Sequence, residues 1–418
     1  MNAADNMSRS PRALKIFKKT SERAEAEVRK NLESLTGRED YSPDFDYFIE
    51  LCRGDSSPES IEARTGRAVM RLLCIQAPIE LIHAAGFHPY KIASGSQAMT
   101  NLALQGLPAL MCPMLRAVLG AVMGSESGEP SGVKPWILPT TCDWVVKFPE
   151  MLASSGTDCA SVHWMELPHL KDGDSCQALW LESVFGLKKF LESLGARVSR
   201  KPIEDSIRIY NNAWRALSRL AMMRQEGRMA NVWFTLIAGS FFLDSPERWT
   251  AAALSINPTP AARSSPKSAR VFLAGSPIFF PNFKLLHLLE DAGISVVSDD
   301  LCSGERIFPG AVTCKDTSEF GMISALAQRY HQGCLCPTFI DNDRRINNIL
   351  SRREVTDFHG VVFHVLKGCH PYDLESLGLE MKLKERGLKF LRLETDYAAE
   401  DSQNLRTRIE AYHGTLKG

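Results

Sequence analysis

The chain has 418 residues, of which 44% are hydrophobic and 23% charged, and at roughly 150 residues per domain this length predicts two or three domains. Its 49 Lys and Arg residues balance its 49 Asp and Glu residues, which argues against a protein that binds nucleic acid or an anionic membrane through bulk charge. No apolar run approaches the about 20 residues that cross a bilayer, and the polar, basic start has no signal-peptide core. We expect a cytoplasmic protein.

The first half of the chain divides into a helical region, residues 1–65, and an α/β domain, residues 66–170. Helical periodicity runs from Ala13 to Leu35, and Ser57 before Pro58 is typical of a helix start. From about Arg67, short apolar segments alternate with helical stretches, which favours a parallel sheet. The segments that we interpret as strands are Leu81–Ala85, Phe87–Ile92, Trp136–Pro139 and Ala160–Leu167.

The second half begins with a helical bridge, residues 171–255, and ends with a second α/β domain, residues 270–418. The bridge has long helical periodicities, 176–194 and 202–225, and no strand signal. The Pro- and Ser-rich segment 255–269 is typical of a linker. Beyond it, strand and helix alternate again. The expected strands are Arg270–Ala274, Ile294–Val297, Val361–Val365 and Phe390–Leu393, with helices at 282–289 and 374–386 among them.

Cysteines follow several of the predicted strands. Cys142, Cys302 and Cys369 each come just after a strand and before an expected helix. In parallel sheets the ligand crevice lies outside the carboxyl ends of the strands. The N–H groups at a helix start also stabilise thiolate, the form that binds metal. These three cysteines are therefore candidate ligands.

Four further cysteines stand at loops or helix starts. Cys334 and Cys336 are two residues apart, so in extended chain their side chains point the same way, about 6.6 Å apart. Cys74 and Cys112 precede helical patterns. The remaining four cysteines lie within ordinary segments, and we interpret them as packing residues because a free cysteine is often a small buried hydrophobe; they are Cys52, Cys159, Cys176 and Cys314.

Two metal chemistries compete for the seven candidates. Structural zinc normally uses pairs of cysteines at close spacing, and the chain has no two such pairs. Thiolates that converge from separate loops suit an iron–sulfur cluster better. The histidines near these motifs, His83, His88, His364 and His370, we interpret as structural residues.

Taken together, the motifs resemble the family of 2-hydroxyacyl-CoA dehydratase and benzoyl-CoA reductase subunits, and within it the double-cubane cluster proteins. The resemblance runs from about Cys74 to Tyr412 in the order of the family. Thr140-Thr-Cys-Asp143 is followed by Trp144-Val-Val, where the dehydratases often carry lysines. The matching segments are Pro78–Gly86, Leu107–Pro113, Pro139–Asp143, Gly275–Pro277, Gly368–Tyr372, Glu394–Tyr397 and Thr407–Tyr412.

This resemblance implies two flavodoxin-like, Rossmann-like parallel-sheet domains with a cluster in the cleft between them. It implies that Cys112, Cys142 and Cys369 hold a 4Fe-4S cubane. The additional Cys302, Cys334 and Cys336 resemble the ligands of a second, sulfide-bridged cubane. Six ligands would suffice, so one of the seven is spare; Cys74 or one of the Cys334/Cys336 pair is our choice.

The resemblance also implies partners. The family receives electrons from a separate ATP-hydrolysing activator with its own 4Fe-4S cluster, and the chain has no Walker-type loop of its own. Family proteins form dimers, so we expect a homodimer or a heterodimer with a homologous subunit. Glu80, in a matching segment, is a candidate acid/base residue, although a glutamate in a first helical turn also stabilises the helix dipole.

Three functions remain open at this point. We expect a low-potential iron–sulfur reductase of a small molecule, fed by the activator. The first alternative is a subunit of a 2-hydroxyacyl-CoA dehydratase or benzoyl-CoA reductase that forms a ketyl radical on an acyl-CoA. The second is an electron-transfer or scaffold subunit without catalysis of its own.

Overall fold

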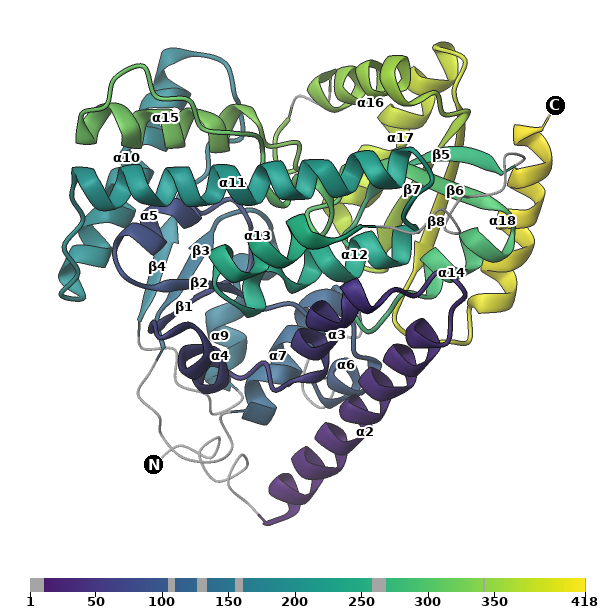
Figure 1. Cartoon of the computed structure of the whole chain (residues 1–418), viewed down its shortest axis with the longest axis horizontal. Coiled ribbons are helices and arrows are strands. Elements are labelled where there is room, and N and C mark those ends of the chain that lie inside the picture. Colours follow the sequence, from purple (N-terminus) through teal and green to yellow (C-terminus); the bar gives the residue numbers. More distant parts are fainter. Residues whose placement is uncertain are drawn as a thin grey trace.

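The computed structural model describes residues 11–103, 110–125, 134–154, 161–257, 268–340 and 343–417. The chain has an α/β fold with two Rossmann-like domains, each built on a four-stranded parallel sheet with helices around it (Figure 1). The first sheet has the strand order β2-β1-β3-β4, and its strands are β1 (Val69–Leu72), β2 (His88–Lys91), β3 (Trp136–Pro139) and β4 (Val162–Met165).

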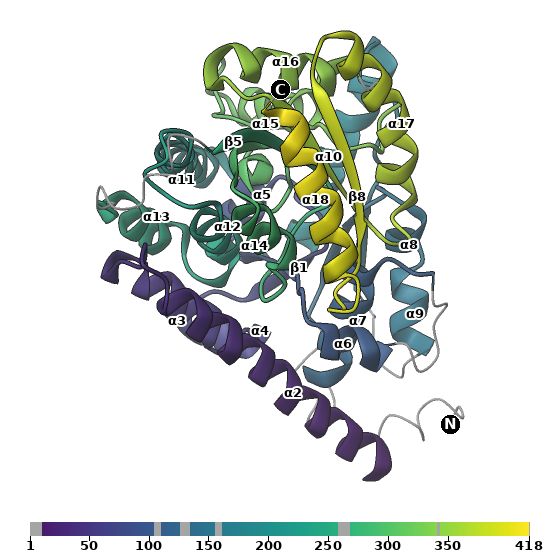
Figure 2. The same ribbon diagram turned by 90° about the vertical axis from the view of Figure 1, so that its right-hand side faces the viewer.

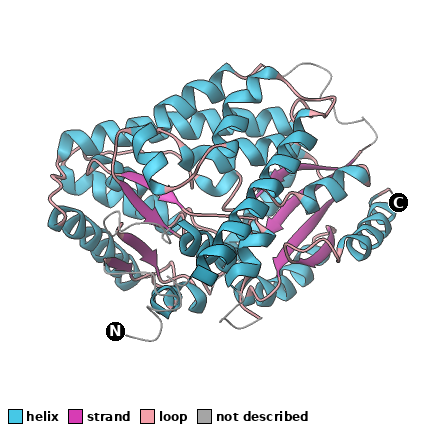
Figure 3. Cartoon of the chain, turned by 90° about the horizontal axis from the view of Figure 1, so that it is seen from below, coloured by secondary structure: helices cyan, strands magenta, loops and turns pink. Residues whose placement is uncertain are grey.

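The second sheet repeats this topology with longer strands, in the order β6-β5-β7-β8. Its central strand β7 is buried at every position, as expected of a parallel strand covered by helices on both faces. Figure 3 shows the two sheets apart from each other among the helices. The strands are β5 (Ala269–Gly275), β6 (Ile294–Asp299), β7 (Gly360–Leu366) and β8 (Lys389–Thr395), and they confirm the four strands predicted for this half.

Helices follow the strands of both sheets. Those of the first domain are α5 (Ile79–Ala84), α6 (Gln97–Ala103), α7 (Pro113–Ser125), α8 (Asp143–Val146) and α9 (Phe148–Ser154). Those of the second are α14 (Lys284–Asp291), the 3-10 turn η4 (Glu305–Ile307), α15 (Glu319–Gln332), α16 (Asp343–Thr356), α17 (His370–Glu385) and α18 (Ser402–Leu416). Among the helices described, none is long and apolar enough to span a membrane.

The N-terminal helices pack on the first domain. The long helix α2 (Pro11–Thr36) lies along α6 (Figure 2). Its Glu27 accepts hydrogen bonds from the Ser96 hydroxyl (2.6 Å) and the Ala98 N–H (3.0 Å), and so caps the start of α6. Three short elements follow, η1 (Pro43–Phe45), α3 (Asp46–Arg53) and α4 (Pro58–Thr65). The Ser57 side chain caps α4 as predicted.

The helical bridge joins the two domains. It consists of α10 (Asp174–Ser193), α11 (Arg200–Gln225), α12 (Asn231–Gly239), η2 (Ser240–Leu243) and α13 (Pro246–Ser255). Ser206 near the start of α11 donates to Glu80 O of α5 (2.7 Å). Arg224 near its end pairs with Asp299 (2.6 Å) at the end of β6. One helix thus contacts both domains (Figure 1).

One predicted strand is wrong. Residues 81–85 belong to helix α5, which begins after Pro78. A short apolar run cannot be assigned by periodicity alone when every side chain is buried. The true first strand, β1, was missed because Arg71 interrupts its apolar run; the guanidinium is buried over the Trp136 ring (4.7 Å) and donates to Lys134 O (2.7 Å). Cys159, Ala160 and most of the predicted linker, 258–267, lie outside the described residues.

Candidate functional site

The cysteines gather where the strands of both sheets end. Cys74 follows β1 and Cys142 follows β3; Cys302 follows β6 and Cys369 follows β7. In both sheets the order reverses beside the first strand, and the crevice at such a switch point is the usual ligand site. Trp144, near Cys142 in helix α8, donates from its ring N–H to Gly368 O (3.3 Å), so α8 of the first domain touches the turn before α17 of the second.

Three cysteines form what we call the helix end of the array: Cys112, Cys142 and Cys369. Cys142 and Cys369 are the N-cap residues of α8 and α17, and Cys112 directly precedes α7. The Cys369 thiol donates to the Cys112 sulfur, which lowers the pKa of Cys112 and raises that of Cys369. Burial raises the pKa of Cys142 to about 12, while the N–H groups of Val145 and Trp144 act against this rise.

The other four cysteines form the loop end: Cys74, Cys302, Cys334 and Cys336. The Cys336 thiol donates to the Cys334 sulfur, which raises the pKa of Cys336 well above its ordinary value. The Cys334 sulfur also accepts from the Cys336 N–H (3.3 Å) and from the Gln76 side-chain amide. Burial raises the pKa of Cys74 to about 12, and the neighbouring sulfurs of Cys336 and Cys302 add to the effect.

The two ends are continuous. Cys142 of the helix end lies close enough to Cys336 of the loop end for their charges to interact. The structure therefore brings all seven candidate cysteines into one array, with Cys74 inside it. Cys52, Cys176 and Cys314 lie elsewhere, in α3, in α10 and before α15. Among the residues described, no three His, Cys, Asp or Glu side chains converge on a point that a single metal ion would occupy.

Buried cations lie beside the loop end. Lys91 donates to Cys302 O (3.0 Å), and Lys171 donates to Cys334 O. Burial lowers the pKa of Lys171 to about 8, and the Cys334 sulfur opposes this shift. Arg306 donates to Asp300 O (2.6 Å) and to the Tyr372 hydroxyl (2.7 Å). A fourth buried cation, Arg116, lies beside Cys112 at the helix end.

These cations and Gln76 are the site residues that the sequence reasoning missed. Lys91 ends β2 and Arg306 follows Cys302 by four residues. Polar residues in the loops at strand ends could therefore have pointed to both. Lys171 stands before α10, far from any cysteine motif in the sequence, and no sequence signal marks it. The helix expected after Cys302 is only the short turn η4.

Glu80 is completely buried and belongs to an ion pair. Its carboxylate pairs with Arg329 (2.5 Å) and accepts from the Tyr330 hydroxyl (2.9 Å), both on α15. Three of the four histidines near the motifs have structural partners, as interpreted, and one of them is His88, which bonds Phe242 O (3.0 Å). His83 bonds Ser206 (2.9 Å), and His364 bonds Ser276 O (2.9 Å) and the Thr395 hydroxyl (2.8 Å). His370 is exposed at the start of α17.

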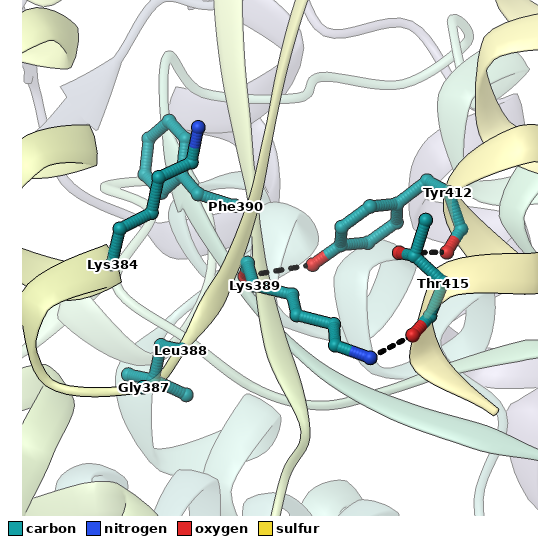
Figure 4. Close-up of a pocket in the computed structure, with 7 residues that line it drawn as sticks. All are labelled: Lys384, Gly387, Leu388, Lys389, Phe390, Tyr412 and Thr415. Carbon is teal, nitrogen blue, oxygen red and sulfur yellow. Dashed lines mark hydrogen bonds between the residues drawn. The ribbon is translucent and has the colours of Figure 1, made fainter. Parts of the chain in front are cut away.

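A separate pocket of about 470 Å³ lies at the amino end of β8, the end of the strand away from the cysteines (Figure 4). Its two lysines have partners already. Lys389 donates to Thr415 O and Lys384 pairs with Glu380 (2.6 Å). The Tyr412 hydroxyl donates to Lys389 O (2.9 Å). The thiol array, which has far more reactive groups, is therefore the candidate functional site.

Comparison with known proteins finds matches over the part of the chain that contains the seven cysteines of the array. Residues 74–416 match the family described as 2-hydroxyglutaryl-CoA dehydratase, D-component. YjiM of Escherichia coli (strain K12), provisionally named a dehydratase subunit, is 27% identical over 81% of this chain and 89% of its own. The lactoyl-CoA dehydratase subunit beta of Anaerotignum propionicum is 23% identical over 85% and 93%. The (R)-phenyllactyl-CoA dehydratase beta subunit of Clostridium sporogenes is 20% identical over 84% and 93%.

Proposed function

Because the chain belongs to the family of the 2-hydroxyglutaryl-CoA dehydratase D-component, we propose that it is an enzyme subunit whose seven-thiol array holds an iron–sulfur cluster. Thiolates are the ligands of such clusters, and the array supplies three at the helix end and four at the loop end. This count favours a bridged double cubane with one spare cysteine. When bound, such a cluster supplies single electrons at low potential.

The observation that carries the proposal is that buried thiols from both sheets meet in one array lined by cations. Some of these thiols touch each other, as Cys112 and Cys369 do. In a bound cluster, iron would lie between such sulfurs and hold them apart. The N–H groups in the first turns of α7, α8 and α17 and the buried cations would stabilise the negative charge of the ligands. The chain's own part is to bind, orient and shield this charge from water.

The test is the content of iron and acid-labile sulfide in the full chain purified without oxygen. About eight iron and nine sulfide per chain would support the double cubane, and about four of each a single cubane. Neither metal nor sulfide in protein that remains folded by circular dichroism would overturn the proposal. Folded protein that carries zinc instead would overturn it as well.

The first candidate function is reduction of a small molecule at this cluster, and the observation in its favour is that the array has enough thiols for a double cubane. A second candidate is a subunit of a 2-hydroxyacyl-CoA dehydratase, and the specific observation in its favour is that two relatives are named as beta subunits of acyl-CoA dehydratases. Turnover of a 2-hydroxyacyl-CoA by the chain together with a second subunit would support the dehydratase. Reduction of a small molecule by the chain with the activator and ATP, and without a second subunit, would support the reductase. If the loaded chain does neither, the electron-transfer or scaffold subunit is the better description.

Electrons would arrive from a separate ATP-hydrolysing iron–sulfur activator. The chain itself has no Walker-type loop, so ATP-dependent turnover requires a second protein. The expected result is that addition of such an activator and ATP to the loaded chain allows turnover that ATP alone does not. Equal turnover with ATP and without the activator would contradict this part of the proposal.

A partner subunit of the same fold would cover the exposed face of α17. Leu374, Leu377 and Met381 are three and four residues apart on this helix and are 73%, 63% and 66% exposed, an unusual apolar stripe for a monomer surface. The helix begins at His370, directly after its N-cap Cys369, and α8 lies on the same side of the molecule (Figure 2). The stripe therefore lies on the helix whose N-cap belongs to the thiol array.

Leu377→Glu would separate the subunits, because a charge would lie in the apolar contact. The measurement is the mass in solution by light scattering, with Val355→Glu on α16, at a residue 74% exposed, as the control. A mass of one chain for the wild type would contradict this interface. If the mass stays that of a dimer in Leu377→Glu while activator-dependent turnover is lost, the stripe binds the activator instead.

A further inference from the structure

Three buried cations surround the loop end of the array. Lys91, Lys171 and Arg306 are 7%, 3% and 7% exposed, and each comes from a different part of the chain. Lys91 lies over the Phe279 ring (4.8 Å) and Lys171 over the Phe339 ring (4.5 Å). Their ammonium groups bond backbone carbonyls of Cys302 and Cys334. Arg306 lies close enough to Cys302 and Cys334 for their charges to interact. All three cations therefore lie around the loop-end cysteines.

None of the three pairs with a carboxylate within ion-pair distance among the residues that the structure describes. Arg306 bonds a backbone carbonyl and a tyrosine hydroxyl. Elsewhere in the same structure buried arginines do have carboxylate partners: Arg345 pairs with Glu375 (3.0 Å) and Arg224 with Asp299 (2.6 Å). The Asp300 carboxylate acts on Arg306 from a distance but is itself paired with Arg345. A buried cation without a counter-charge of its own costs several kcal/mol, so the loop end is suited to receive negative charge.

The helix end differs. Its one buried cation beside a thiol, among the described residues, is Arg116, which acts on Cys112. Otherwise its sulfurs face helix N-termini and neutral groups. Cys112 and Cys369 pack with Tyr397, Trp144 and Leu366. The positive charge of the site is therefore concentrated at one end of the array.

We propose that Lys91, Lys171 and Arg306 are positioning residues that stabilise an added electron at the loop end of the bound cluster. This inference rests on the proposed iron–sulfur function. One electron from an external one-electron donor adds one negative charge to the cluster, and no covalent bond of the protein forms or breaks. Because the electron has lower energy near the three cations, the loop end would have a higher reduction potential than the helix end.

The experiment is a reductive titration of the full chain with titanium(III) citrate, followed by electron paramagnetic resonance. The neutral variants are Lys91→Met, Lys171→Met and Arg306→Gln. Each is expected to lower the equilibrium constant for the first electron by about tenfold, which is about 59 mV for one electron. The variants Lys91→Arg, Lys171→Arg and Arg306→Lys keep the charge and should keep the wild-type potential. Arg116→Gln, at the other end, should leave the first step unchanged.

The outcomes separate this inference from the function on which it rests. Iron and sulfide are counted first, and their absence in the wild type would overturn the proposed function. A full cluster whose first potential is the same in the neutral variants would overturn only the inference, and so would a first step that shifts in Arg116→Gln alone. If a neutral variant does not fold while its charge-conserving partner folds and keeps the potential, the requirement for charge at that position is supported.

Discussion

The helix end and the loop end of the array provide for negative charge in different ways. At the helix end the backbone does so: Cys142 and Cys369 are helix N-caps, and their neighbours' N–H groups face the sulfurs. At the loop end charged side chains do so. Backbone dipoles are fixed by the fold and cost nothing extra when the anion leaves, whereas buried cations then lose their counter-charge. The loop end is therefore the part of the site that depends most on what it binds.

The largest effect is expected from removal of ligands at either end. Cys302→Ser should lower the iron content from about eight to about four per chain, because only the proposed loop-end cubane is lost. Cys336→Ser should do the same unless Cys336 is the spare cysteine. Cys369→Ser should instead remove the helix-end iron. Cys52→Ser, at a packing cysteine in α3, serves as the control with unchanged iron. Iron that is the same in both loop-end variants as in the wild type would show that the cluster lies at the helix end alone.

The loop end is anchored by the ion pair of Glu80. Arg329 and Tyr330, its partners, lie on α15 just before Cys334. Glu80→Ala would leave a buried arginine unpaired, and we expect a loss of about 3–5 kcal/mol in the free energy of unfolding. Urea denaturation of the metal-free chain measures this loss.

The matched control for Glu80→Ala is Glu150→Ala, which breaks an exposed pair with Lys147 and should cost at most about 1 kcal/mol. An acid/base role for Glu80 makes a different prediction. If Glu80→Ala keeps the wild-type stability but turnover is lost, the residue is catalytic rather than an anchor.

The sequence predicted the helix end better than the loop end. Cysteines after buried strands and before helices can be recognised, because apolar runs and N-cap positions are local patterns, and the four strands of the second sheet were found for the same reason. Lys91, Lys171 and Arg306 could not be found in this way. Three distant segments bring them together, and each alone reads as an ordinary surface cation. Strand β1 was missed for a related reason. A charged residue such as Arg71 is typical of an exposed loop in a sequence, but here it lies in a buried strand.

Acid should weaken the second sheet beside the helix end. Burial lowers the pKa of His364 to about 4, so the folded chain keeps this ring neutral while the unfolded chain protonates it near pH 6.5. The unfolded state thus binds more protons between about pH 6.5 and 4. The free energy of unfolding should therefore fall by about 3 kcal/mol as the pH falls through this range.

His364→Gln should remove the contribution of this one titrating group to the pH dependence. The glutamine amide can still form hydrogen bonds with Ser276 O and the Thr395 hydroxyl. The measurement is the free energy of unfolding at several pH values for both proteins. The same slope in both would show that His364 does not titrate on unfolding. Other buried histidines would account for the slope that remains in the variant, among them His83, whose pKa burial lowers to about 3.

The smallest effect is expected at the turn that presents Cys369. Gly368 has φ +75°, and a side chain there would collide with Leu110 O, close to Cys112. Gly368→Ala should therefore cost about 1–3 kcal/mol and separate Cys369 from Cys112. Gly378→Ala on α17, where an added Cβ would have no atom within 4 Å outside its own helix backbone and chain neighbours, should instead gain about 0.5–1 kcal/mol from helix propensity. Thermal unfolding measures both; equal stability of the two variants would mean that the close contact between the turn and residue 110 does not hold the helix end together.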